Sequence, residues 1–288
     1  MGLFDDLDNT DVTEETPVLR APFGYMGAKT RSLKHILPML PYRNSYIEVF
    51  GGSGVALLNR RSSKLDVYND RYGGIVSFYR CLRDKEKFDA LIGWLELTVH
   101  SKEDYLFCRD TWKDCNDIVE RAGRWYYSVA YSFSSKGTAW GRTVSSTPLA
   151  GQIRRKLPAF DAVHRRLENV QIENSSWEVM FRDYDNSEAV FYLDPPYVAT
   201  DTTMYKYTMN HDDHRRMLQT IMDAKGFVAL SGFSNTLYDG YDWDDRISWE
   251  VTCTLTGNAN NERNCKAHLD GLESYHQAEE VLWIKEAK

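Results

Sequence analysis

Two kinds of hydrophobic periodicity alternate before residue 84 and again after residue 165. Short runs rich in Val, Ile, Phe and Tyr end at glycine, aspartate or proline, which predicts strands. Between them, apolar positions three and four residues apart predict helices. The predicted strands cover residues 46–50, 64–70, 188–194, 226–234, 247–257 and 279–287. The predicted helices begin near residues 31, 55, 73, 84, 159 and 211.

The order of these elements predicts an α/β fold. Repeated strand, turn and helix units are typical of a mostly parallel, Rossmann-like sheet. The alternation is interrupted at residues 84–165, which are predicted to be helical up to residue 130 and then form a polar loop or hairpin and one more helix. We therefore predict one α/β domain made of residues 17–83 and 166–288, with residues 84–165 as an inserted, mainly helical domain.

Composition changes this picture through the distribution of charge. The chain of 288 residues has a net charge of −7, which counts against a nucleic-acid partner. Residues 1–16 contain six acids and no base, which predicts a disordered acidic arm. Residues 134–166 contain seven bases and one acid. This locally basic segment keeps a nucleic-acid partner open.

Cysteines and apolar runs indicate the compartment. The five cysteines are scattered and form no CxxC pair, so we expect free thiols and neither a disulfide framework nor a zinc site. No apolar run approaches the roughly 18 residues of a membrane helix, and the first residues lack the pattern of a signal peptide. These observations predict a cytoplasmic protein that does not contact a membrane.

A glycine turn follows the first predicted strand. In "YIEVFGGSG", Gly51, Gly52 and Gly54 allow close approach of a ligand to the backbone, and the next helix directs its positive end there. Asp70 ends the second predicted strand, 22 residues after Glu48. An acid at about this spacing binds ribose hydroxyls in doubly wound sheets, although Asp70 also suits a solvated turn.

A second turn precedes this unit. "FGYMGAK" places Tyr25 and Lys29 around small residues, before an amphipathic helix predicted at residues 31–39. The pattern GxxxxGK[ST] of a phosphate-binding loop is absent. Lys29 is therefore available for a carboxylate, such as that of a nucleoside bearing an amino acid.

The stretch "FYLDPPYV" ends a buried strand with residues that cannot extend it. Pro195 and Pro196 lack backbone donors, so the strand must end near Asp194. The strand is thus succeeded by a rigid turn that carries one carboxylate, unpaired carbonyl groups and the ring of Tyr197.

Taken in order, "FGYMGAK", "YIEVFGGSG", "VYND" and "FYLDPPY" resemble the Dam-like adenine-N6 DNA methyltransferases. The resemblance covers most of residues 22–80 and 188–285. It implies a Rossmann-like methyltransferase sheet, S-adenosylmethionine as cofactor and double-stranded DNA as partner. It also implies that residues 84–165 are the target recognition domain, although no motif matches there. One departure is Ala28, where many relatives have glycine.

The resemblance assigns roles to residues that match its motifs. The implied catalytic residues are Asp194, Pro195, Pro196 and Tyr197. The implied cofactor-binding residues are Tyr25, Met26, Gly27, Ala28, Lys29, Glu48, Phe50, Gly51, Gly52, Ser53, Gly54, Asp70 and Asp194.

The chemistry of methyl transfer explains the residues of the Asp-Pro-Pro-Tyr turn. An adenine amino group is a poor nucleophile because its lone pair is delocalised, and it gains positive charge as it attacks the sulfonium methyl. The Asp194 carboxylate and the Pro195 carbonyl would stabilise that charge, and the prolines would hold these acceptors rigid. Tyr197 would stack on a base flipped out of the duplex.

Several alternatives stay open. C5 methylation of cytosine is disfavoured because no Pro-Cys dipeptide occurs. Cytosine-N4 methylation, RNA adenine methylation and a catalytically silent nucleic-acid-binding module remain. His211 and His214 could share a metal, but "NHDDHRR" fits a helix start capped by Asn210, so we expect no metal site.

The basic segment supplies the candidate DNA contacts, which are Lys136, Arg142, Arg154, Arg155 and Lys156. A solvated basic surface is the alternative, and the loop at residues 257–264 is a second candidate.

Overall fold

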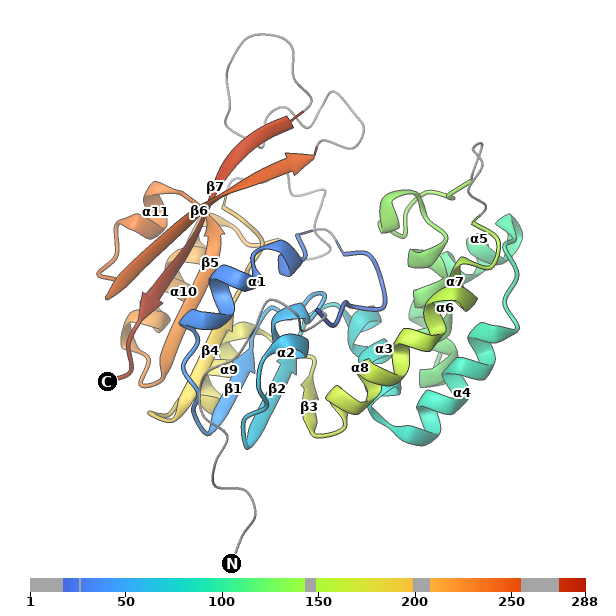
Figure 1. Ribbon diagram of the computed structural model, residues 1–288, viewed down its shortest axis with the longest axis horizontal. Coiled ribbons are helices and arrows are strands. Elements are labelled where there is room, and N and C mark those ends of the chain that lie inside the picture. The colour runs from blue at the N-terminus through green and yellow to red at the C-terminus, as the bar shows by residue number, and fades with distance from the viewer. Residues whose placement is uncertain (1–17, 26, 143–148, 199–207, 255–274) are drawn as a thin grey trace, which may run out of the picture.

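A single twisted sheet is the centre of the computed structural model, which describes residues 18–25, 27–142, 149–198, 208–254 and 275–288 (Figure 1). Within these ranges the sheet has seven strands in the order β3-β2-β1-β4-β5-β7-β6. The strands are β1 (Ser45–Glu48), β2 (Leu65–Asn69), β3 (Val170–Glu173), β4 (Ala189–Leu193), β5 (Phe227–Phe233), β6 (Asp245–Thr254) and β7 (Tyr275–Lys285). All neighbouring pairs from β3 to β5 are parallel, whereas β7 is antiparallel to both β5 and β6. The predicted mostly parallel sheet is confirmed.

The strand order reverses at the centre of the sheet, between β1 and β4. Ile47 of β1 is in register with Val67 on one side and Phe191 on the other, and all four residues of β1 are buried. The chain moves outward in one direction from β1 and in the other direction from β4. Ligands of doubly wound sheets bind in the crevice at the carboxyl ends of such strands.

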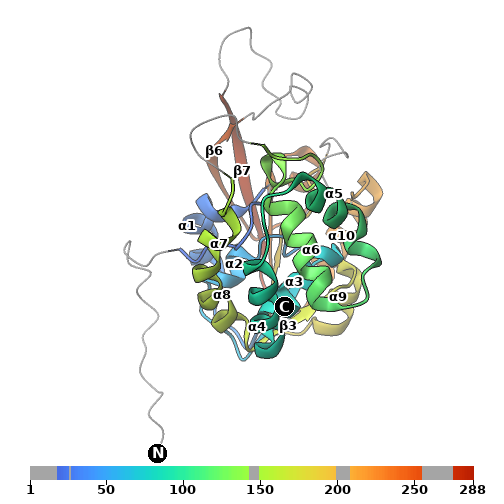
Figure 2. The ribbon, with the colours of Figure 1, turned by 90° about the vertical axis from the view of Figure 1, so that its right-hand side faces the viewer.

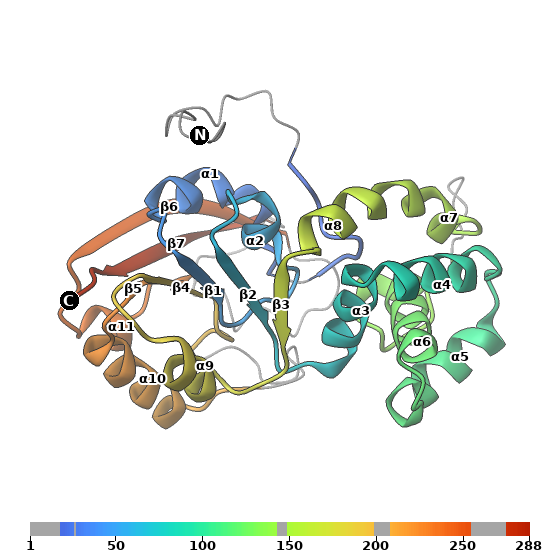
Figure 3. The same ribbon diagram turned by 90° about the horizontal axis from the view of Figure 1, so that it is seen from below.

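Helices cover both faces of the sheet, because alternate strand residues point to opposite faces. Val190 and Tyr192 of β4 belong to the first core cluster, while Phe191 and Leu193 belong to the second. The first cluster includes residues of α1 (Leu33–Ile36), α2 (Val55–Asn59), α3 (Gly73–Arg83) and α8 (Phe160–Leu167). The second includes residues of α9 (Trp177–Tyr184), α10 (His211–Asp223) and α11 (Thr236–Asp239). Figure 3 shows α1 and α2 on one side of the sheet and α9, α10 and α11 on the other.

The interrupting segment is helical, as predicted. It contains α4 (Lys85–Glu96), α5 (Lys102–Thr111), α6 (Ile118–Ala130) and α7 (Gln152–Lys156), which lie together beyond β3 (Figures 1 and 2). Their core continues that of the sheet: the rings of Phe78 and Tyr126 stack with centroids 4.9 Å apart. The Tyr126 hydroxyl also donates to the Pro22 carbonyl. The division of the chain into domains stays a prediction.

Some predicted boundaries were wrong. The helix predicted at residues 31–39 is divided into three pieces: the 3₁₀ helix η1 (Lys29–Arg31), α1, and the 3₁₀ helix η2 (Leu37–Met39). The break after α1 occurs where Pro38 cannot donate a helical hydrogen bond. The short edge strand β3 and helix α9 were not predicted. Three more short 3₁₀ helices are described: η3 (Trp112–Asp114), η4 (Phe133–Ser135) and η5 (Leu157–Ala159).

The structure describes the side chains of three of the cysteines. Cys81 and Cys108 are buried, Cys115 is partly exposed, and all three are free thiols, as predicted. None of the described helices combines the length and apolar character needed to cross a membrane. The predicted acidic arm, Met26 and the loop at residues 257–264 lie outside the described ranges.

Candidate active site

The glycine turn after β1 is packed against tyrosine rings. A Cβ atom at Gly51 would lie 2.2 Å from the Tyr68 ring, so no larger residue fits there. Gly52 has a φ of +49°, and a Cβ there would lie 2.6 Å from the ring of Tyr25. The Tyr68 hydroxyl donates to the Gly52 carbonyl at 2.7 Å. The turn therefore has a fixed shape at the carboxyl end of β1.

Asp70 is bound to this turn. Its Oδ2 accepts a hydrogen bond from the Gly52 amide at 2.7 Å, and its Oδ1 accepts one from the Tyr72 amide at 2.6 Å. Burial raises the pKa of Asp70 to about 6, although both amide bonds favour the charged form. Tyr25, Gly52 and Asp70, all predicted to bind the cofactor, are thus brought together.

Glu48 has a structural role at the end of β1. Its Oε2 accepts hydrogen bonds from the Tyr46 hydroxyl at 3.0 Å and from the Leu57 amide of α2 at 2.7 Å. Burial raises the pKa of Glu48 to about 8. The carboxyl group joins β1 to α2.

Three other predicted cofactor residues, Phe50, Ser53 and Gly54, belong to the turn itself. Phe50 is partly buried, and the Ser53 carbonyl accepts a hydrogen bond from the Tyr79 hydroxyl. Gly54 has a positive φ and precedes α2, which has only five residues. Gly27 and Ala28 are exposed.

Asp194 follows β4 directly, and β4 is the parallel neighbour of β1, after which the glycine turn comes. Its Oδ1 accepts a hydrogen bond from Ser231 Oγ at 3.1 Å and lies 2.7 Å from Lys29 Nζ. Ser231 is fully buried on β5, and its hydroxyl also contacts that of Tyr192 at 3.1 Å. Burial raises the pKa of Asp194, and the charge of Lys29 opposes that rise.

Lys29 is buried between two carboxylates. Its Nζ lies 3.1 Å from Glu280 Oε1 as well as 2.7 Å from Asp194 Oδ1, and it donates to the Tyr197 hydroxyl. Burial alone would lower the pKa of Lys29, but the neighbouring Asp194, Tyr197 and Glu280 outweigh it and raise the pKa well above its usual value. The contact of Lys29 with a cofactor carboxylate stays a prediction.

Tyr197 completes this group. Its ring packs on Phe233 with centroids 4.4 Å apart, and its hydroxyl lies 3.5 Å from Glu280 Oε1. Pro195 is buried and Pro196 is partly buried. Two of the predicted catalytic residues, Asp194 and Tyr197, therefore meet Lys29. Ser231 and Glu280 join the same group, and the sequence analysis did not predict either of them. A charged residue inside the apolar run "EEVLWIK" was the available signal for Glu280.

The predicted DNA contacts differ in their surroundings. Lys136 and Arg142 are exposed. Arg154 is exposed, but its Nε donates to the Glu96 carbonyl at 2.9 Å. Arg155 is exposed as well, whereas Lys156 is partly buried and burial lowers its pKa. Part of the basic segment is therefore engaged within the protein.

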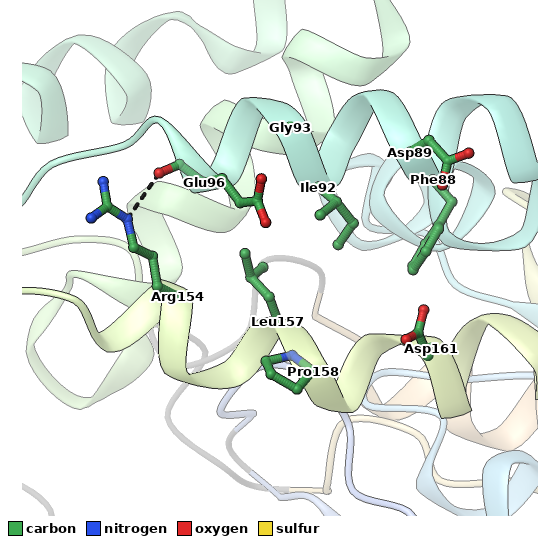
Figure 4. Close-up of a pocket in the computed structure, with 9 residues that line it drawn as sticks. All are labelled: Phe88, Asp89, Ile92, Gly93, Glu96, Arg154, Leu157, Pro158 and Asp161. Carbon is green, nitrogen blue, oxygen red and sulfur yellow. Dashed lines mark hydrogen bonds between the residues drawn. The ribbon is translucent and has the colours of Figure 1, made fainter.

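A groove with a volume of about 690 Å³ lies between α4 and the chain from α7 to α8, with Arg154 at one end (Figure 4). Three acids, Asp89, Glu96 and Asp161, contribute to its lining. Phosphate groups are repelled by such a lining, so we do not expect the DNA backbone to follow this groove.

His214 has a structural explanation. It is buried, its Nδ1 and the Tyr238 hydroxyl are hydrogen-bonded at 2.8 Å, and burial lowers its pKa to about 4. Asn210 and Asp213 form a reciprocal cap at the start of α10, as predicted for Asn210. Within the described ranges, no group of three or more His, Cys, Asp or Glu side chains could hold a metal ion.

The sheet order, the glycine turn after β1 and the Asp-Pro-Pro-Tyr turn after β4 define an S-adenosylmethionine-dependent methyltransferase of amino groups. Residues 25–243 match the model of the D12 class N6 adenine-specific DNA methyltransferases, and the chain belongs to that family. The Dam-like resemblance is confirmed. The protein transfers methyl groups to adenine N6 in DNA, which selects among the chemistries left open by the sequence.

Two relatives agree with this assignment. The chain is 24% identical over 230 residues to the type II methyltransferase M.CviBI of Paramecium bursaria Chlorella virus NC1A, covering 75% of this chain and 85% of that protein. It is 22% identical over 206 residues to the modification methylase StsI of Streptococcus sanguinis, covering 67% of this chain and 31% of that protein.

Proposed function

We propose that methyl transfer takes place at Asp194–Tyr197, on an adenine flipped out of double-stranded DNA. The supporting observation is the asymmetry of the Asp194 carboxylate. Lys29 and Ser231 both bind Oδ1, and among the residues that the structure describes none forms a hydrogen bond or ion pair with Oδ2. Oδ2 is therefore the oxygen available to the adenine amino group.

The residues act on the amino group as it gains charge. Asp194 Oδ2 and the Pro195 carbonyl each accept a hydrogen bond from one N–H group of the adenine amino group. These bonds stabilise the positive charge that develops on N6. Lys29 and Ser231 hold the carboxylate in one orientation, which keeps the attacking nitrogen in line. The Tyr197 ring, supported by Phe233, stacks on the flipped base. S-adenosylmethionine would supply the electrophilic methyl group and be left as the neutral thioether, and the methylated amino group would then release one proton to solvent.

The cofactor is assigned to the crevice next to this group, at Tyr25, the turn from Phe50 to Gly54, and Asp70. The hydrogen-bonding groups at this place fit a nucleoside. Each Asp70 oxygen accepts one backbone hydrogen bond and retains acceptor capacity for the ribose hydroxyls. Tyr25 is 38% exposed and lies against Gly52, which suits contact with the cofactor.

Asp70→Asn is expected to weaken S-adenosylmethionine binding by about 1–3 kcal/mol, because a charged acceptor is removed. In the wild type, affinity should also fall as the pH drops through about 6, where Asp70 takes up a proton. Calorimetry across this range should show no such inflection for the variant. The control is Asn174→Ala, because Asn174 Nδ2 donates only to the backbone carbonyl of Asp70. Equal affinities for wild type and Asp70→Asn would contradict the ribose assignment.

We further propose that residues 84–165 contact DNA through their basic side chains. Neutralising Arg154, Arg155 and Lys156 together should weaken binding to all duplexes alike, and reduce the salt slope by about 0.9 for each phosphate that is no longer neutralised. Because Arg154 donates to the Glu96 carbonyl and Lys156 is partly buried, we expect a larger effect from neutralising the exposed pair Lys136 and Arg142. Fluorescence anisotropy at several salt concentrations measures both slopes.

The matched control neutralises Arg215 and Arg216 on α10, which are exposed and paired with acids. For this control variant, the slope of log DNA affinity against log salt concentration should equal that of the wild type. If all three variants keep the wild-type slope, the segment carries only a solvated basic surface and the proposal fails.

A further inference from the structure

Glu280 is a buried carboxylate directly before the apolar run Val281–Ile284 of β7. It lies on β7, in register with Phe233 of β5 and Trp249 of β6, and only 4% of it is exposed. Val281 and Trp283 point to the second core cluster, so Glu280 points to the opposite face, where Lys29 lies. Burying a carboxylate costs several kcal/mol unless partners compensate for it.

Each oxygen of Glu280 has a different kind of partner. Oε1 lies 3.1 Å from Lys29 Nζ and 3.5 Å from the Tyr197 hydroxyl. Oε2 accepts a hydrogen bond at 2.6 Å from Ser32, whose hydroxyl in turn accepts one from Trp249 Nε1 at 3.2 Å. One oxygen therefore contacts the proposed catalytic group, and the other is anchored to the scaffold.

The ammonium group of Lys29 is shared as a result. Its three hydrogens face three acceptors, namely Asp194 Oδ1, Glu280 Oε1 and the Tyr197 hydroxyl. One cation between two buried carboxylates cannot neutralise both. Asp194 therefore keeps much of its negative charge, which is the charge that the developing positive N6 requires.

We propose that Glu280 is a positioning residue for methyl transfer: its carboxylate holds Lys29 and Tyr197 in place and keeps Lys29 from neutralising Asp194. This inference rests on the proposed catalytic role of Asp194. If the Glu280 charge is removed, Lys29 pairs with Asp194 alone, which makes that carboxylate a weaker acceptor and weakens the hold on Tyr197.

The pH profile reports on this role. Burial raises the pKa of Asp194, and the Glu280 charge raises it further. Removing that charge should move the acid limb of the kcat profile to lower pH. The titratable groups that face or influence Asp194 are Lys29 from η1, Tyr192 from β4, Tyr197 from the turn after β4, Glu280 from β7, Glu48 from β1 and Tyr238 from α11.

The test compares Glu280→Gln with Ser32→Ala, by kcat and KM for duplex DNA from pH 5 to 9. Glu280→Gln should lower kcat roughly tenfold, less than the removal of a group that touches the substrate, with KM unchanged and the acid limb at lower pH. Ser32→Ala removes the donor to Oε2 and the acceptor of Trp249 Nε1 but no charge near Asp194, so its acid limb should stay at the wild-type pH. Thermal unfolding shows that each variant is folded.

Two results would overturn the proposal: a wild-type kcat and profile for Glu280→Gln, or the same shift of the profile for Ser32→Ala. Glu280→Asp keeps the charge and should return the acid limb toward the wild type. If it does not, charge is not the cause and the proposal also fails. Asp194→Asn separates the two hypotheses, because an active Asp194→Asn refutes the catalytic assignment, whereas an inactive one with an unaltered Glu280→Gln refutes only the role of Glu280.

Discussion

Asp194→Asn is expected to reduce methyl transfer roughly 100- to 1,000-fold while the fold stays intact. Lys29 and Ser231 both donate to Oδ1, so the amide of the variant must place its oxygen there. Its NH₂ group, a donor, then faces the adenine amino group, which is also a donor. The substitution thus removes the charge and reverses the polarity of the contact. Transfer of labelled methyl groups to duplex DNA at saturating S-adenosylmethionine measures the effect.

Asp66→Asn is the matched control for this experiment. Asp66 is buried on β2 and pairs with Arg166 at 2.8 Å, outside the proposed site. We expect this variant to lose stability but to keep the specific activity of its folded fraction, whereas Asp194→Asn should show the opposite. Near-wild-type turnover by folded Asp194→Asn would refute the proposed mechanism.

Lys29→Met is expected to have the largest effect on stability. Methionine has a similar length, but it leaves Asp194 and Glu280 as two buried carboxylates without a cation. Breaking a buried ion pair from one side destabilises a fold by about 3–5 kcal/mol. Activity should fall as well, because Asp194 Oδ1 and the Tyr197 hydroxyl each lose a donor. Denaturant unfolding at fixed pH measures the destabilisation.

The destabilisation should depend on pH in a defined direction. The pKa of Asp194 is already raised in the folded protein, and without Lys29 it rises further. A carboxyl group with a higher pKa in the folded chain than in the unfolded chain stabilises the fold less as pH rises above the unfolded value of about 4. The variant should therefore be closer to the wild type at pH 5 than at pH 8.

Lys85→Met provides the comparison, since Lys85 pairs with Asp89 in an exposed position on α4. Exposed pairs contribute little to stability, so its unfolding should match the wild type at both pH values. A stability loss for Lys29→Met that is the same at pH 5 and pH 8 would show that the charge of Lys29 does not compensate that of Asp194.

Local features of the sequence predicted the parts of the site that are themselves local. The glycine turn and the Asp-Pro-Pro-Tyr turn are contiguous, and their backbone demands can be read from residue types alone. Ser32 and Glu280 are separated by 248 residues, and their contact exists only because β7 inserts between β5 and β6. The hydrophobic periodicity of the sequence predicts strands but not the order in which they lie in the sheet. The same limit explains why a count of bases could not distinguish Arg166, paired with Asp66, from Lys136, which is exposed.

The stacked rings of Phe78 and Tyr126 bear on whether segment 84–165, for which we propose DNA contacts, can be exchanged between enzymes. A recognition unit joined only by linkers can be exchanged as a cassette. Here α6 shares an aromatic core with α3 and α8, since Phe160 packs edge-on against both Phe78 and Tyr126. A grafted segment 84–165 would have to bring a complementary surface for α3, which lies outside the segment. Under the DNA-contacting role that we propose for this segment, changes of exposed side chains on these helices are therefore a more accessible route to altered DNA binding than exchange of the whole segment.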